Sequence, residues 1–556
     1  MNKVLVVAAL AAAVCPLMAQ TADVGCDGAV AAKAGRSGPC TPLAKQIDEV
    51  LSAPAVARAH WGIDVTAMDG TPIYSLNDGQ LFQPASNTKM FTTATALALL
   101  GSQATFETRV VARGSFNTPA NLAGDVVLVG GGDANLSGRT IPYVPPALRP
   151  KPTPGGPALP EPDALRYLKQ MADDVAKTGL KVVNGDIVGD DTLYPWEPYP
   201  EEWSIDDSLW GYGAPVSALT ITDNQLVLKV APGAAPGQPA VITLDPIAPY
   251  YTVDATALIT GPAKSGSHVQ IDRAMGSKAL RLYGSIAVDA QPDDEEIAIH
   301  DPAEYAAMVF KSLLEQRGIL VTGVAKAKHR LPTDSRGYYA ASHETVTLED
   351  RSYAIAKGTP TACVSNCAAP APETVLATHT SPALIEDMTV TNKVSQNLHA
   401  EMFLHNVGAA VLGDGSTANG ARVVRAFLTT RVGIDPDDFV FFDGSGLSGH
   451  DLLAPRATVK LLHYATTQPW FADWKKTLPI GGEDGSLVAR FGRTALKDHV
   501  FAKTGTLGEA RALGGFIECA SGKTVIFSIM DSTHSPHSSE DMKAMDKIVG
   551  LIAAAN

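Results

Sequence analysis

Three short polar motifs that lie far apart in the chain constrain its fold more than any other feature. They are residues 86–89 (SNTK), 395–397 (SQN) and 503–506 (KTGT). The first two begin 309 residues apart, whereas the second and third begin 108 residues apart. If the motifs form one site, the long interval must fold as an insertion into a domain that both ends of the chain build together.

The first motif suits nucleophilic chemistry. A serine hydroxyl is a weak nucleophile at neutral pH and needs a neighbouring base. Positions i and i+3 of a helix share one face, so Lys89 can present its amine to Ser86. The apolar residues that follow recur at helical spacing and predict a buried helix. Taken alone, the pair also fits a helix cap at Ser86 and a solvated Lys89.

The other two motifs narrow the interpretation. Ser-x-x-Lys, a Ser-x-Asn element and Lys-Thr-Gly form the serine-acylating set of penicillin-binding proteins and class A β-lactamases, and all three occur here in that order. Residues 512–520 and 523–530 read as two strands of a hairpin after the third motif. Ser395 falls between two helical stretches, where we expect a loop.

Beyond these motifs, the sequence resembles the class C low-molecular-mass penicillin-binding proteins, the D-alanyl-D-alanine carboxypeptidase/endopeptidase family. Four further blocks carry the resemblance: residues 124–137, 203–225, 443–455 and 478–490. The resemblance implies an α/β (α+β) fold, in which a transpeptidase/β-lactamase-like domain is assembled from both chain ends and carries mainly β nested insert domains.

The organisation of the chain follows from motif spacing and strand patterns. We expect a signal peptide at residues 1–19 and a catalytic domain formed by residues 20–104 and 297–556. Strand patterns dominate residues 105–296, which should form the inserted, mainly β domains. A Pro-rich surface loop is predicted at residues 140–162.

The N-terminus has the pattern of an export signal, because Lys3 precedes an apolar run that ends near a small-residue cleavage site. We therefore expect a periplasmic or secreted protein without a transmembrane segment. The amphipathic C-terminal helix should pack in the core rather than anchor the chain to a membrane.

Cysteine usage agrees with an oxidising compartment. Cys26 with Cys40, and Cys363 with Cys367, are close enough in sequence for two local disulfides, although the pairing is open. Cys519 lies in an apolar hairpin and should be a buried thiol. No Cys/His spacing typical of zinc occurs, so we expect neither a metal nor a cofactor.

The predicted reaction is acyl transfer. Ser86 would attack the carbonyl of the penultimate D-alanine of a peptidoglycan stem peptide, Lys89 would take its proton, and Ser395 would relay a proton to the leaving nitrogen. Asn397 offers a donor and an acceptor to Lys89 and to the substrate amide. β-Lactam antibiotics should acylate the same serine.

The third motif and part of the insert should bind substrate. Lys503 and the Thr504 hydroxyl suit the terminal carboxylate, and the backbone N–H groups of Ser86 and Thr506 suit an oxyanion hole. The resemblance adds two positions from the insert. The predicted substrate-binding residues are Lys503, Thr504, Gly505, Thr506, Asp207 and Tyr212.

The sequence departs from the family pattern at the pocket for the third side chain of the stem peptide. Relatives usually have arginine after Gly-Leu-Ser, whereas here Gly449 and His450 follow. Gly508 likewise stands where a larger polar residue is usual. The catalytic prediction is unaffected, but the preference for a diamino acid at that position stays open.

The net charge argues against one class of function, and the motifs leave two alternatives to a peptidase. The net charge of −14 argues against nucleic-acid binding, which requires a basic face. A β-lactamase would share the acylation step but needs fast deacylation. A catalytically silent periplasmic wall-binding protein is a further alternative, which the intact polar motifs disfavour. The oligomeric state is not predicted.

Overall fold

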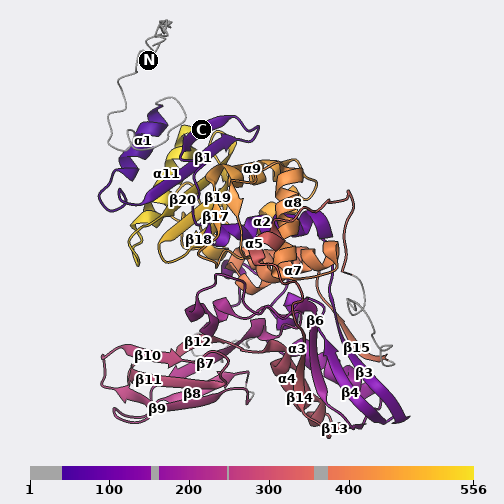
Figure 1. Cartoon of the computed structure of the whole chain (residues 1–556). Coiled ribbons are helices and arrows are strands. Elements are labelled where there is room, and N and C mark those ends of the chain that lie inside the picture. The colour runs from indigo at the N-terminus through magenta and orange to yellow at the C-terminus, as the bar shows by residue number, and fades with distance from the viewer. Residues whose placement is uncertain (1–40, 152–161, 247–248, 356–372) are drawn as a thin grey trace, which may run out of the picture.

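The computed structural model describes residues 41–151, 162–246, 249–355 and 373–556, which form two lobes (Figure 1). We call the first the N/C lobe, because it contains both ends of the described chain: residues 41–104, 331–355 and 381–556. The second, the insert lobe, contains residues 105–330 and 373–380, apart from the gaps.

A five-stranded antiparallel sheet with the order β18-β19-β20-β1-β2 forms the centre of the N/C lobe. Its strands are β1 (His60–Ala67), β2 (Pro72–Leu76), β18 (Val500–Thr506), β19 (Ala510–Glu518) and β20 (Thr524–Ser532). Ile529 is directly opposite Ile63 on β1 and Leu513 on β19. The first and last parts of the chain are therefore hydrogen-bonded into one sheet.

Both faces of this sheet are covered by helices, as the alternation of side chains along a strand requires. Phe527 and Ile529 pack with α1 (Pro42–Leu51) and α11 (Glu540–Ala555) on one face. Ile526 and Met530 of the same strand pack on the other face. The C-terminal helix therefore packs in the core, as predicted from its sequence.

The second face is covered by a group of helices that surrounds α2. These helices are α2 (Thr88–Leu100), α5 (Tyr338–Ser342), α6 (Leu384–Val394), α7 (Asn397–Leu412), α8 (Thr417–Phe427), α9 (Pro455–Thr466) and α10 (Phe471–Thr477), together with the short strands β16 (Phe439–Val440) and β17 (Leu452–Leu453). Trp474 is fully buried in this layer, and its indole N–H donates to the Thr93 hydroxyl on α2.

The insert lobe combines a seven-stranded sheet with two three-stranded sheets around one core. The seven strands are β3 (Glu107–Thr118), β4 (Asn121–Val129), β5 (Val182–Val183), β6 (Ile187–Pro195), β13 (Leu320–Val321), β14 (Ala325–Arg330) and β15 (Glu373–Thr380). The smaller sheets contain β7 (Gln225–Ala231), β8 (Val241–Asp245), β9 (Thr252–Gly261), β10 (Ser267–Asp272), β11 (Ala279–Ala287) and β12 (Asp293–Ala298). The helices are α3 (Arg166–Lys177) and α4 (Pro302–Gln316).

The insert lobe continues past residue 296, where the sequence analysis placed its end. β13, β14 and β15 all follow that residue, yet they join the sheet that contains β3 and β4. β14 pairs in parallel with β6, and parallel pairing needs a long crossover connection, so the partner strand returns late in the sequence. We propose that the second catalytic segment begins near residue 331 and is interrupted by β15.

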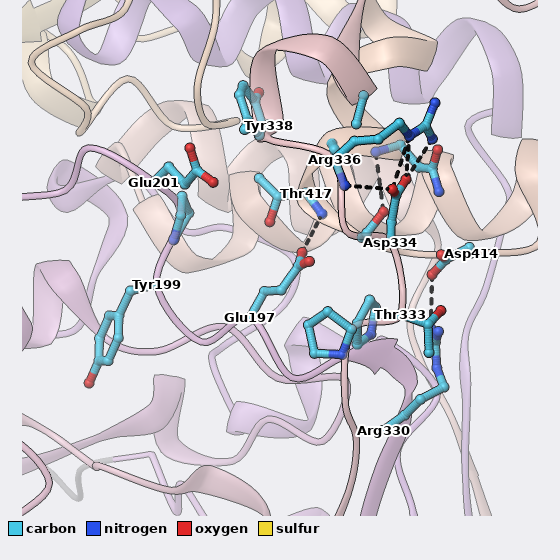
Figure 2. A pocket seen from close by; sticks show the side chains of 17 residues that line it. Glu197, Tyr199, Glu201, Arg330, Thr333, Asp334, Arg336, Tyr338, Asp414 and Thr417 are labelled. Carbon is cyan, nitrogen blue, oxygen red and sulfur yellow. Dashed lines mark hydrogen bonds and ion pairs between the residues drawn. The ribbon is translucent and has the colours of Figure 1, made fainter. Parts of the chain in front are cut away.

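The two lobes also meet at a cavity of about 150 Å³ between β6, β14, α5 and α8 (Figure 2). Glu197 accepts a hydrogen bond from the backbone N–H of Thr417 at 3.0 Å. Arg330 forms an ion pair with Asp414 at 2.9 Å across the same junction. Because each of these contacts joins one lobe to the other, they fix the relative position of the lobes.

Some sequence-based predictions fall outside the described residues. The signal peptide, the Cys26/Cys40 pair and the Cys363/Cys367 pair all do so. The prediction for Cys519 is confirmed, because it is a free, buried cysteine. Among the helices of the described ranges, none combines the length and the apolar character needed to cross a bilayer.

A substitution at Ile529 tests how much the packing of the central sheet contributes to stability. The strand that carries Ile529 lies between β1 and β19, and its side chain is fully buried in the core with α1 and α11, so Ile529→Ala should remove packing that nothing replaces. We expect the free energy of unfolding to fall by about 2–5 kcal/mol, seen as a lower melting temperature in circular dichroism. The control is Ile259→Ala, because Ile259 is 46% exposed; equal losses for both variants would contradict this core assignment.

Candidate active site

Ser86 lies at the junction of the short 3-10 helix η1 (Ala85–Asn87) and α2. The backbone at Ala85 is left-handed, with φ of 46°, which is unusual for a residue with a side chain and often marks a functional site. Strand β18 passes so close that a Cβ on Gly505 would lie 2.4 Å from the Pro84 carbonyl oxygen. Glycine at 505 therefore lets the third motif approach the nucleophile.

Lys89 lies at the centre of the site and is fully buried. Its Nζ is 2.8 Å from Ser86 Oγ, 2.6 Å from Asn397 Oδ1 and 2.7 Å from the Ser445 carbonyl oxygen. The three neighbours come from the short helix η1, from α7 and from the loop before β17. One amine thus joins three segments of the N/C lobe.

Burial lowers the pKa of Lys89 to about 8, although the nearby carboxylates of Asp443, Glu401 and Asp451 partly offset this effect. An ordinary lysine has a pKa near 10.4. At neutral to mildly basic pH a substantial fraction of Lys89 is therefore neutral, as a proton acceptor must be.

The second motif contacts the third. Ser395 ends α6 in a left-handed conformation with φ of 61°, and its Oγ accepts a hydrogen bond from Lys503 Nζ at 2.8 Å. Lys503 is also fully buried, and burial together with the charge of Lys89 lowers its pKa well below the usual value. Two amines in one buried site therefore oppose each other's protonation.

A cleft of about 880 Å³ opens above these groups, between the two lobes. Of the predicted site residues, those that line it are Ser86, Asp207, Tyr212, Ser395, Asn397 and Thr506. Lys89 and Lys503 are buried beneath the cleft. Each contacts the hydroxyl of a serine that lines it, Ser86 for Lys89 and Ser395 for Lys503. The four residues predicted to be catalytic, Ser86, Lys89, Ser395 and Asn397, therefore lie close together in space.

Thr504 and Gly505 lie differently from the prediction of direct substrate contact. The Thr504 hydroxyl is 2.7 Å from the Ser486 hydroxyl, and neither residue is among those that line the cleft. Gly505 instead packs against the segment that carries Ser86.

The insert lobe supplies one side of the cleft. The Tyr212 hydroxyl donates to Asp207 Oδ1 at 3.0 Å, and the Tyr212 carbonyl accepts from Asn397 Nδ2 at 2.8 Å. Burial raises the pKa of Asp207. The insert lobe thus contacts the second motif directly.

The positions that depart from the family pattern lie at the mouth of the same cleft. Gly449, His450 and Gly508 all line it. The imidazole of His450 is 3.5 Å from Glu202, and both side chains are largely exposed, so this ion pair contributes little. A Cβ on Gly508 would meet nothing within 4 Å, which leaves open space where a larger residue could stand.

The sequence analysis missed the acids beneath Lys89. Asp443 accepts hydrogen bonds from the backbone N–H groups of Gly446 and Ser448, at 2.6 and 2.8 Å, and thereby holds the loop that presents the Ser445 carbonyl. Burial and the charge of Asp443 raise the pKa of Glu401 to about 8. Asp443 lies in a block that carried the family resemblance, but no spacing rule assigned it a role.

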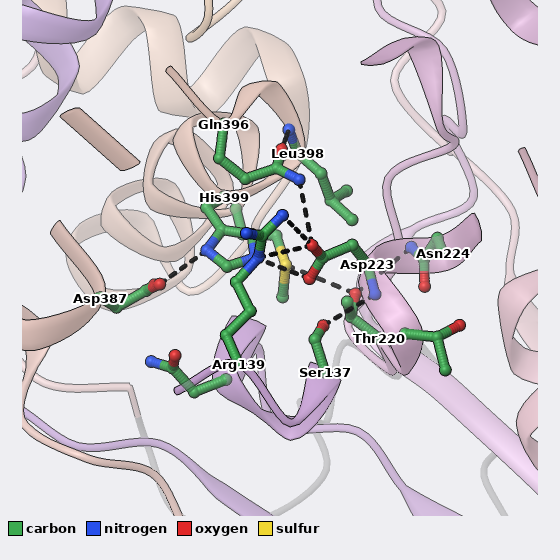
Figure 3. A network of polar contacts seen from close by, with 12 residues as sticks. Ser137, Arg139, Thr220, Asp223, Asn224, Asp387, Gln396, Leu398 and His399 are labelled. Carbon is green, nitrogen blue, oxygen red and sulfur yellow. Dashed lines mark hydrogen bonds and ion pairs between the residues drawn. The ribbon is translucent and has the colours of Figure 1, made fainter. Parts of the chain in front are cut away.

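A buried polar network behind the second motif was also missed (Figure 3). Asp223 of the insert lobe accepts from Arg139 Nε at 2.6 Å and from Gln396 Nε2 at 3.3 Å. His399 lies between Asp223 and Asp387, with its ring nitrogens at 3.1 and 2.6 Å from their carboxylates. Because Gln396 separates Ser395 from Asn397, this network positions both motif residues.

The charges of this network stabilise one another. Burial opposes ionisation of Asp223, but Arg139 and His399 outweigh it and hold the pKa of that carboxyl well below its usual range. Burial alone would lower the pKa of His399, whereas Asp387 and Asp223 raise it to about 9. His399 is therefore a buried imidazolium at neutral pH.

Comparison with known proteins connects this site to one family. Residues 43–357 and 356–552 match the sequence model of the D-Ala-D-Ala carboxypeptidase 3 (S13) family. A D-alanyl-D-alanine carboxypeptidase of Actinomadura sp. (strain R39) is 32% identical over 521 residues, which cover 91% of this chain and 84% of the relative. The D-alanyl-D-alanine carboxypeptidase DacB of Haemophilus influenzae is 24% identical over 466 residues, which cover 82% of this chain and 81% of the relative.

Solved structures agree at the level of the fold. The crystal structure of penicillin-binding protein 4 (dacB) from Haemophilus influenzae superposes with a TM-score of 0.72 at 21% identity, and it covers 92% of this chain and 98% of that one. A complex of that protein with a β-lactam gives a TM-score of 0.66, with 91% and 99% covered. The predicted mixed helix and strand fold, with one domain assembled from both chain ends, is confirmed.

The network around His399 predicts a pH-dependent contribution to stability. The folded-state pKa of about 9 lies above the ordinary value of 6.5, so the contribution is fully present below pH 6.5 and is lost as pH rises through 9. A shift of this size corresponds to about 3 kcal/mol. His399→Gln should therefore melt at a lower temperature than the wild type at pH 6, and the gap should shrink by pH 9.5.

The control for this comparison is His268→Gln, because His268 is exposed on β10. Its melting temperature should follow that of the wild type throughout. A gap between the His399 variant and the wild type that stays constant from pH 6 to pH 9.5 would contradict a buried imidazolium.

Proposed function

The chain belongs to the D-Ala-D-Ala carboxypeptidase 3 (S13) family, and we propose that it is a serine DD-peptidase acting on peptidoglycan stem peptides. It would hydrolyse the D-alanyl-D-alanine bond through an acyl-enzyme on Ser86, and penicillins would inhibit it by acylating the same residue. Family membership supports the reaction class, and the contacts of Lys89 support the assignment of residues.

The arrangement around Lys89 Nζ carries this proposal. A neutral amine has two N–H donors and one lone pair. Two of its neighbours, Asn397 Oδ1 and the Ser445 carbonyl oxygen, can only accept hydrogen bonds, so they take both donors. The lone pair is then left for the third neighbour, the Ser86 hydroxyl. This arrangement supports Lys89 as the general base.

Acylation would proceed in two linked transfers. Ser86 Oγ bonds to the carbonyl carbon of the penultimate D-alanine while its proton moves to Lys89 Nζ. The C–N bond then breaks, and the proton that Lys89 received passes to the leaving nitrogen by way of the Ser395 hydroxyl, which Lys503 contacts, so that Lys89 is again the free base. Water attacks the resulting ester, and the same groups return the proton to Ser86.

Lys503 would bind the terminal carboxylate of the substrate. Without an anion in the cleft, burial and Lys89 disfavour its charged form. A bound carboxylate would reverse that balance, because an opposite charge nearby raises the pKa of an amine. Substrate binding and protonation of Lys503 would therefore be coupled.

The insert lobe would bind the third side chain of the stem peptide. Asp207 and Tyr212 line the cleft beside Gly449 and Gly508, so this pocket has an acid and a phenol but neither large polar residue. A side chain with a free amine would suit Asp207. We propose that the enzyme acts on D-alanyl-diamino-acid cross-links as well, after export to the periplasm and removal of residues 1–19.

Labelling with a fluorescent penicillin tests the nucleophile. The wild type should form a stable adduct at Ser86, and Ser86→Ala should form none, because the attacking oxygen is gone. Ser267→Ala is the control, because Ser267 is exposed on β10 in the other lobe. Labels are detected on denaturing gels and located by peptide mass spectrometry.

Three results would contradict this proposal in different ways. Adduct on the Ser86 variant would place the nucleophile elsewhere. Rapid turnover of the penicillin by the wild type would indicate a β-lactamase. A wild type that neither labels nor releases D-alanine from purified muropeptides would indicate a silent wall-binding protein.

The pH dependence of acylation tests Lys89. With a pKa of about 8, its free base becomes the main form above that pH, so the second-order rate constant for penicillin should rise about 10-fold per pH unit well below 8 and level off above it. Lys89→Arg stays protonated at all these pH values and should lose most of the rate. A wild-type profile that is flat from pH 5.5 to 9 would exclude Lys89 as the base.

A further inference from the structure

Three buried side chains meet behind the β18–β19 hairpin, away from the cleft. Asp531 is on β20, His534 follows in the next loop, and Asp541 lies in the first turn of α11. Their residues are 0%, 7% and 1% exposed. One ligand atom from each lies within 4.8 Å of the others, the only such His/Cys/Asp/Glu group among the described residues.

The polar atoms of this cluster are poorly satisfied. Neither ring nitrogen of His534 has a hydrogen-bond partner, and the same is true of Asp531 Oδ2 and Asp541 Oδ1. Buried polar atoms nearly always have a partner, because leaving one unpaired is costly. Because these atoms belong to three residues that each place one ligand atom within 4.8 Å of the others, they indicate a missing common partner.

The neighbouring arginine, Arg511, contacts one oxygen of each aspartate in the cluster and leaves the other atoms without a partner. Arg511 Nε forms an ion pair with Asp541 Oδ2, and the Arg511 backbone N–H donates to Asp531 Oδ1 at 2.8 Å. Asp531 Oδ2 is left facing His534.

The spacing of the atoms fits a metal ion better than hydrogen bonds. His534 Nδ1 is 3.3 Å from Asp531 Oδ2 and 3.6 Å from Asp541 Oδ2. Two ligand atoms at about 2.0–2.2 Å from a tetrahedral zinc ion lie about 3.4 Å apart. We propose that Asp531, His534 and Asp541 bind one divalent transition-metal ion, of which Zn²⁺ is the best match.

The ligand set supports a transition metal over Ca²⁺ or Mg²⁺. Imidazole suits Zn²⁺ and its neighbours in the periodic table, whereas Ca²⁺ and Mg²⁺ prefer oxygen ligands alone. Arg511 would take the outer position that commonly orients a ligating carboxylate. The sequence analysis expected no metal because it searched for Cys/His spacing, and this set is mainly carboxylate.

The location indicates a structural role. Arg511 is opposite Thr506 in the β18–β19 ladder, and the His534 backbone N–H donates to the Glu509 carbonyl at 3.3 Å. Glu509 is at the turn of the hairpin, which lines the cleft. A metal ion at this point would therefore fix the hairpin from behind without contacting substrate.

Metal binding by the purified mature chain tests this site. After treatment with EDTA and removal of the chelator, the wild type is titrated with ZnCl₂ alone by calorimetry, and bound zinc is counted by mass spectrometry after gel filtration. His534→Gln removes one ligand, and His537→Gln is the matched control, because His537 is exposed in the same loop. The wild type and the control should bind one more zinc ion per chain than His534→Gln.

Thermal unfolding supplies a second readout that does not depend on catalysis. ZnCl₂ should raise the melting temperature of the wild type and of His537→Gln but not of His534→Gln, because a ligand stabilises only the state that binds it. MgCl₂ should have a much smaller effect. If His534→Gln does not fold, replacing Zn²⁺ by Co²⁺ in the wild type should give the visible absorption of a four-coordinate site.

The proposal is overturned if the stripped wild type binds no zinc and its melting temperature does not respond to ZnCl₂. It is equally overturned if His534→Gln binds as much zinc as the control. Either result would leave the cluster as a set of contacts within the protein alone. Penicillin labelling of Ser86 is a separate measurement, so failure here and failure of the proposed function can be distinguished.

Discussion

The burial of one amine, that of Lys89, is the constraint on which the rest of the structure depends. An ammonium group away from water is costly unless other groups compensate its charge. Here Asn397 Oδ1 and the Ser445 carbonyl oxygen accept hydrogen bonds from the amine. Asp443 and Glu401 lie close enough to shift the pKa of Lys89. These groups come from different segments, so the site forms only when α2, α7 and the loop before β17 pack together. The packing of the N/C lobe therefore also brings the residues of the site together.

The insert lobe takes part in that assembly. Asp223 of this lobe accepts hydrogen bonds from Arg139 of the same lobe and from Gln396 of the second motif. The Tyr212 carbonyl oxygen accepts a hydrogen bond from Asn397. The left-handed backbone of Ser395 places that residue toward Lys503. A conformation of this kind persists only where the surroundings hold it. The Asp223 network supplies this support, which gives the large insertion a structural function at the site in addition to any contact with substrate.

The features that could be predicted from the sequence are those that depend on residues close together in the chain. The helix that carries Ser86, the hairpin after residue 506 and the position of Ser395 between two helices follow from spacing and turn residues, and the structure has all three. It could not identify Asp223 or His399, because their contact joins residues 176 positions apart that no motif connects. The end of the insert was placed too early for a similar reason. β14 and β15 look like ordinary strands, and only their partners show which sheet they join.

Two buried charged clusters flank the cleft, and their difference explains why only one of them calls for an additional ligand. Behind the second motif, His399 and Arg139 face Asp223 and Asp387, so positive and negative groups balance within hydrogen-bonding distance. Behind the hairpin, Arg511 faces both Asp531 and Asp541, and His534 makes no hydrogen bond through either ring nitrogen. A buried network is stable when every member has a partner and is costly otherwise. The first cluster needs only protein atoms to hold Ser395, whereas the second holds the opposite wall of the cleft fully only when a cation completes it.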